Sequence, residues 1–167
     1  MSGIIGVSPD MRSGVVGKYP AGHILKIETT YGSGSHDLSA VTGMTATGLK
    51  DSITFTAGNK ILVIASIMVG SWSGGTDTGQ QVKLYDNTNS TDLPPHAQHW
   101  YHATESSSPE TDAEGVITLC PDLYAPSGTT VEIELYHANP WSEGGAGTPL
   151  ARVMKNLSTL KLMEVQA

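Results

Sequence analysis

The chain has 167 residues, of which 38% are hydrophobic and 19 are glycine. This length fits one domain with a sizeable core, and the composition excludes wholesale disorder. Only 15% of the residues are charged, and 16 acidic against 9 basic side chains give a formal net charge of −7. Because such a surface repels phosphate groups, we expect no nucleic-acid partner and no anionic membrane partner.

Residues 1–22 are predicted to form an extended N-terminal arm. Glycines interrupt its apolar residues, and Pro9 and Pro20 prevent a continuous helix. The segment lacks the basic start and the long apolar core of a signal peptide. The arm either packs on its own domain or docks on a partner subunit or a larger assembly. For docking, the candidate residues are Ile4, Ile5, Val7, Val15, Val16 and Tyr19.

Residues 23–167 show short strand patterns separated by polar turns. Strands are expected at residues 23–30, 49–56, 61–69, 80–85, 97–104, 116–120, 131–137 and 158–165. Helical signals are almost absent; only residues 151–157 have room for a turn or two. About eight short strands predict an all-β domain, an antiparallel β-sandwich of jelly-roll or Greek-key type. We expect the first and last of these strands to pair or to lie close together.

The strand at residues 61–69 is apolar on both of its faces. A two-layer sandwich in water leaves one face of such a strand solvated, so we expect a further layer outside its own sheet. Another subunit is one way to supply that layer. The residues assigned to this interface or core are Ile61, Val63, Ile67 and Val69.

Three blocks of small and apolar residues carry a family resemblance. They comprise residues 2–6, 13–17 and 20–23 near the start, residues 53–56 and 59–63 in the middle, and residues 158–165 at the end. These blocks resemble small virion proteins of aquatic tailed bacteriophages. The resemblance implies a homotrimeric jelly roll of the tumour-necrosis-factor-like type, serving as a capsid decoration, a head fibre or a tail-fibre knob. It also implies synthesis in the host cytoplasm, a place on the particle surface, and contact with the major capsid protein or with a fibre or tail protein.

Two segments have residue types that bind metals. Residues 96–102 hold three histidines, but His96 and His102 on one strand would lie about 20 Å apart, too far to share an ion. A surface strand is the favoured interpretation; a metal site, or a ring of one histidine from each of three subunits, stays an alternative. Residues 86–90 carry side-chain oxygens that could bind calcium, but we interpret this segment as a turn. We expect no cofactor.

Catalytic motifs are missing from the sequence. It contains no Gly-x-Ser-x-Gly or His-Glu-x-x-His pattern, and Cys120, the single cysteine, is expected to be a small buried residue. We therefore predict a non-enzymatic virion structural protein. The alternative is a carbohydrate-binding module in which Trp72 and Trp141, in Gly/Ser-rich loops, stack on host surface glycans. These two tryptophans could instead plug the ends of the sandwich or line a subunit contact.

Overall fold

The fold is known from a computed structural model, which describes residues 21–38, 42–73, 78–101, 111–140 and 150–167. Within these ranges the chain forms nine strands and no helix. The strands are β1 (Ile24–Tyr31), β2 (Ser35–Leu38), β3 (Thr42–Thr54), β4 (Lys60–Ser73), β5 (Thr78–Asp86), β6 (Thr91–Tyr101), β7 (Thr111–Leu119), β8 (Thr130–Asn139) and β9 (Leu150–Val165).

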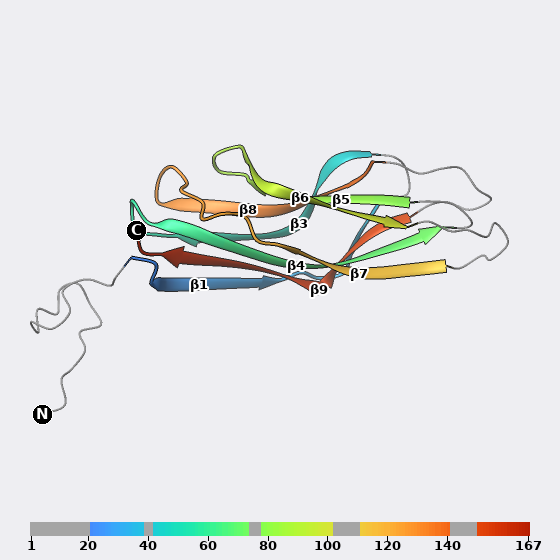
Figure 1. Cartoon of the computed structure of the whole chain (residues 1–167), viewed down its shortest axis with the longest axis horizontal. Helices are drawn as coiled ribbons and strands as arrows, with labels where there is room; N and C mark the ends of the chain where they lie inside the picture. The colour runs from blue at the N-terminus through green and yellow to red at the C-terminus, as the bar shows by residue number, and fades with distance from the viewer. Residues whose placement is uncertain (1–20, 39–41, 74–77, 102–110, 141–149) are drawn as a thin grey trace, which may run out of the picture.

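The strands form two antiparallel sheets that stack face to face (Figure 1). Sheet A has the order β1-β9-β4-β7, with β2 also paired to β9, and sheet B has the order β3-β8-β5-β6. The pairs are nested along the chain: β5 with β6, β4 with β7, β3 with β8 and β1 with β9. Such a long hairpin rolled on itself is a jelly roll. The structure thus confirms the predicted antiparallel sandwich, and the first and last expected strands pair as β1 and β9.

The core lies between the sheets, where β4, β5, β8 and β9 contribute alternate residues and β3, β6 and β7 contribute a few more. In β4 the inward residues Ile61, Val63, Ile67 and Val69 are all 0% exposed. The outward residues Leu62, Ile64 and Met68 are only half-buried. Within the single chain, sheet B covers only the inner face of β4, so the expected further layer over its outer face stays a prediction.

Several local expectations need correction. Residues 151–157 belong to strand β9 and not to a helical turn, and residues 151–154 pair with β2 on one side and β4 on the other. Pro94 and Pro95 lie inside β6 and not in a loop, with a cis peptide bond between them. Strand β6 is an edge strand of sheet B, where missing backbone donors are tolerated. Cys120 is exposed and not buried.

Candidate functional site

The outer face of sheet A carries two groups of apolar side chains, separated by a polar row of Thr159, Ser66 and Thr118. The strand register places Ile27 of β1, Met163 of β9 and Leu62 of β4 in one row. A second row, beyond a bulge in β4 and β9, joins Met154, Met68 and Val116. Together with Ile64 between the rows, these residues define the apolar face: Ile27, Leu62, Ile64, Met68, Val116, Met154 and Met163.

The apolar face is open to water at its margins. Ile27 on β1 is 55% exposed and Val116 on β7 is 65% exposed, although both are large apolar side chains. Lys161 of β9, which pairs with Ile64 and is itself exposed, lies among them. Exposed apolar side chains gathered on one sheet face are characteristic of protein–protein contact sites. The apolar face is therefore the surface of the described chain best suited to bind another protein.

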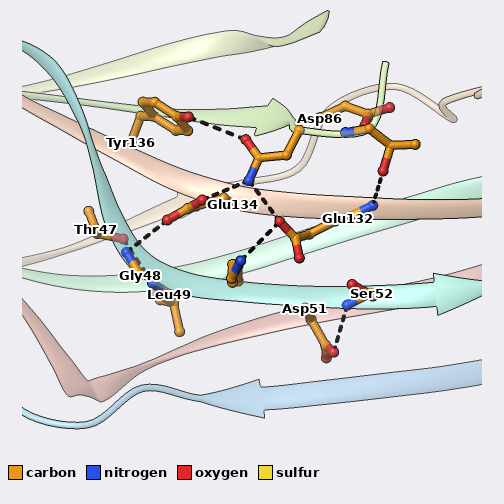
Figure 2. A network of polar contacts seen from close by, with 12 residues as sticks. Thr47, Gly48, Leu49, Asp51, Ser52, Asp86, Glu132, Glu134 and Tyr136 are labelled. Carbon is orange, nitrogen blue, oxygen red and sulfur yellow. Dashed lines mark hydrogen bonds and ion pairs between the residues drawn. The ribbon is translucent and has the colours of Figure 1, made fainter. Parts of the chain in front are cut away.

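The outer face of sheet B carries a network of polar contacts, part of which Figure 2 shows from close by. The Asn87 side-chain nitrogen donates to Glu132 Oε1 at 2.9 Å and to Glu134 Oε2 at 2.7 Å. Lys50 Nζ also donates to Glu132 Oε1, at 3.1 Å, and the Gly48 amide donates to Glu134 Oε1, at 2.9 Å. The Asn87 bond, followed by the Lys50 bond, lowers the pKa of Glu132. These carboxylates of β8 therefore join β3 and the turn that follows β5.

The turn at residues 86–90 is organised around the buried side chain of Asp86. Its Oδ1 accepts hydrogen bonds from the amides of Thr88 and Asn89, at 2.8 and 2.9 Å. Its Oδ2 accepts from Asn89 Nδ2 at 2.7 Å and from the Tyr124 hydroxyl at 2.6 Å. Burial, followed by the bond to Asp86, raises the pKa of Tyr124 to about 12. The turn-forming role predicted for this segment is confirmed.

Two histidines that the sequence did not single out meet between the sheets. His36 of β2 and His137 of β8 bring their Nδ1 atoms to 3.2 Å. A signal for His137 was present, because the inward alternation of residues 131, 133 and 135 continues to residue 137. Among the described residues no three His, Cys, Asp or Glu side chains gather in a way that could hold a metal ion.

The sequence-predicted site residues are placed only in part. Ile61, Val63, Ile67 and Val69 line the core, so a second copy of the chain could contact only their outward neighbours. Trp72 lies in β4 and not in a loop, and its backbone pairs with Leu150 and Asp112. The parts of the site that fall outside the described residues are the side chains of Trp72, His96 and His99, together with His102, Trp141, Ile4, Ile5, Val7, Val15, Val16 and Tyr19.

Comparison with known proteins does not assign a family. No family model and no curated protein sequence matches the chain. Among solved structures, the T13 particle of infectious bursal disease virus gives a TM-score of 0.36 at 16% identity, over 98% of this chain and 40% of that one. The Gx strain of that virus gives 0.32 at 12% identity, over 98% and 42%. TM-scores this low leave the function open, and the chain spans about two fifths of the length of these proteins.

No helix in the described part of the chain has the length and apolar character needed to cross a membrane.

Proposed function

We propose that this chain is a non-enzymatic structural protein of a bacteriophage virion, located on the particle exterior and assembled as a homotrimer through the apolar face. The exposed apolar surface of sheet A is the observation that carries the proposal. The resemblance of the amino-acid sequence to small phage virion proteins supports the virion role. The protein is made in the host cytoplasm and acts on the particle as a capsid decoration or a fibre knob.

A threefold arrangement supplies the layer that the outer face of sheet A lacks. Three copies around an axis can each cover the apolar face of a neighbour and leave the polar face of sheet B in water. Interfaces of permanent assemblies are apolar and resemble a domain core cut in half. The half-buried Leu62, Ile64 and Met68 and the exposed Val116 have the chemistry that such an interface requires.

An aspartate in the apolar face should dissociate the trimer. Val116→Asp places a carboxylate on the exposed margin of the face, where burial against a neighbour would remove its hydration. We expect the wild-type chain to sediment as a trimer and Val116→Asp as a monomer with an unchanged circular dichroism spectrum. The matched control is Thr54→Asp, at an exposed position of sheet B, which should remain trimeric. A wild-type chain that sediments as a monomer at micromolar concentration would refute the trimer.

The arm of residues 1–22 is the proposed attachment to the major capsid protein or to a fibre or tail protein. Strand β1 enters the sandwich beside the chain terminus, because the Gly22 amide donates to the Gln166 carbonyl at 2.8 Å and the Gln166 amide donates to the His23 carbonyl at 2.8 Å. Figure 1 shows this point at one end of the molecule. Attachment through the arm would therefore turn the end of each sandwich that contains Gly22 and Gln166 towards the particle.

Polar residues in the arm should prevent attachment without unfolding the domain. For the full chain carrying both Ile4→Ser and Ile5→Ser, we expect loss of co-sedimentation with phage particles that lack this protein. The wild-type chain should co-sediment with the same particles. Thermal unfolding should be the same for both chains, because the described strand pairs involve no residue before Ile24. A lower unfolding temperature in the double variant would mean that the arm is part of the core.

A further inference from the structure

We propose that His36 and His137 form an acid-sensitive latch between the two sheets, and that mild acidification releases β2 from sheet B. The proposal is independent of the trimer and of the virion role. It follows from the position of the two imidazoles, from the protons that their contact can hold, and from the charges around them.

The pair joins the two sheets at a weakly held element. His36 lies on β2, which has four residues and pairs only with β9 in sheet A. His137 lies on β8, where it pairs with Val82 of β5 and Thr45 of β3 in sheet B. The two rings meet edge to face, with centroids 5.5 Å apart. The contact is therefore a direct hydrogen bond from β2 across the interior to sheet B.

The contact holds a single proton. At 3.2 Å, one Nδ1 donates to the other, so at least one ring is neutral. With both rings protonated, two N–H groups would point at each other. His137 is 0% exposed, and its Nε2 is buried without a hydrogen-bond partner. A cationic His137 would thus carry a second N–H that no acceptor satisfies.

The surrounding charges do not offset this cost. Burial lowers the pKa of His137 to about 3, and the positive charge of a protonated His36 acts in the same direction. Burial, followed by the nearby Lys155 ammonium of β9, lowers the pKa of His36. Asp37 of β2 acts in the opposite direction, but its carboxylate oxygens accept from Arg152 Nε and Nη2, each at 2.7 Å. Thr45 and Val82, which pair with His137 from β3 and β5, carry no charge.

Acid therefore favours the state in which the latch is open. Both rings regain an ordinary histidine pKa near 6.5 in water, so opening takes up protons once the pH falls below that value. The stabilisation provided by neutral, buried rings is present above pH 6.5 and decreases as the pH falls towards the lowered pKa values. The apolar core cluster of the described residues contains no titrating side chain, so we expect the response to acid at the contact between β2 and β8.

Hydrogen exchange measured by mass spectrometry tests the latch on the full chain. After correction for intrinsic exchange, we expect the protection of residues 35–38 to fall at least about tenfold between pH 7.5 and pH 5. Opening that takes up one proton becomes more favourable over the 1.5 pH units below pH 6.5, which is enough for a change of this size. His36→Asn keeps a donor near the Nδ1 position and removes one of the two titrating rings, so its protection should fall less than that of the wild type over the same pH range. The matched control His23→Asn should respond like the wild type, because His23 is exposed.

A second variant and a direct readout keep the test decisive. His137→Asn, where it folds, should show the same flattened pH response as His36→Asn. Nitrogen-15 spectra of the wild type should show His137 still neutral at pH 5. Equal loss of protection in wild type and His36→Asn, or a His137 that protonates near pH 6.5 without loss of protection, would overturn the proposal.

Discussion

Replacing Asp86 with alanine is expected to lower the free energy of unfolding by about 3 kcal/mol. The variant leaves the Tyr124 hydroxyl and the amides of Thr88 and Asn89 without their acceptor. An unsatisfied buried donor costs about 1–3 kcal/mol, and exposure of part of the turn to water keeps the sum for these donors near the lower end of the possible range. Urea unfolding followed by circular dichroism measures the loss.

Two matched variants distinguish the loss of the Asp86 hydrogen bonds from the loss of a negative charge. Asp92→Ala also removes a carboxylate, but Asp92 is exposed and pairs with Lys83 at the surface, so we expect a loss below about 1 kcal/mol. Tyr124→Phe removes one of the four donors and should cost about 1 kcal/mol. An Asp86→Ala variant as stable as Asp92→Ala would show that the carboxylate does not hold this turn.

Local alternation predicted the strands whose two faces differ most. In residues 131–137 the apolar Val131, Ile133 and Leu135 are buried, while Glu132 and Tyr136 are half-buried on the outer face. Apolar and polar residues alternate in such a strand because one face of the sheet lies in the core and the other faces water. The fold class followed from repeated patterns of this kind separated by turn residues.

Long-range pairing decided what local sequence could not. Residues 151–157 include alanine, arginine, methionine and lysine, all good helix formers. They nevertheless form part of β9, because residues 151–154 pair with β2 on one side and β4 on the other. His36 and His137 are 101 positions apart in the chain. Only the stacking of sheet A on sheet B brings them together, so no short pattern could have revealed the latch.

The strand at residues 61–69 shows where sequence reasoning reaches its limit. Its pattern is apolar on both faces, which predicts that water is unfavourable on both. The pattern does not state what covers the second face. In the single chain that face is half-buried, and the proposed trimer is the means by which it becomes fully dry.

The two faces of β4 should therefore respond differently to the same truncation. Ile67→Ala removes a side chain that is 0% exposed between the sheets, so we expect a loss of about 2–5 kcal/mol at any protein concentration. Ile64→Ala, on the outer face, should cost about 1 kcal/mol or less when the protein is dilute and monomeric, because its side chain is only half-buried there.

At higher protein concentration the difference between the two variants should narrow. Assembly stabilises the folded chain by mass action, so the unfolding midpoint of the wild type should rise with protein concentration. Ile64→Ala weakens the proposed contact and should flatten that rise, whereas Ile67→Ala should lower the midpoint and leave the slope unchanged. Thermal unfolding over a hundredfold range of concentration measures both quantities. A wild-type midpoint that is independent of concentration would mean that the outer face of β4 does not meet another copy of the chain.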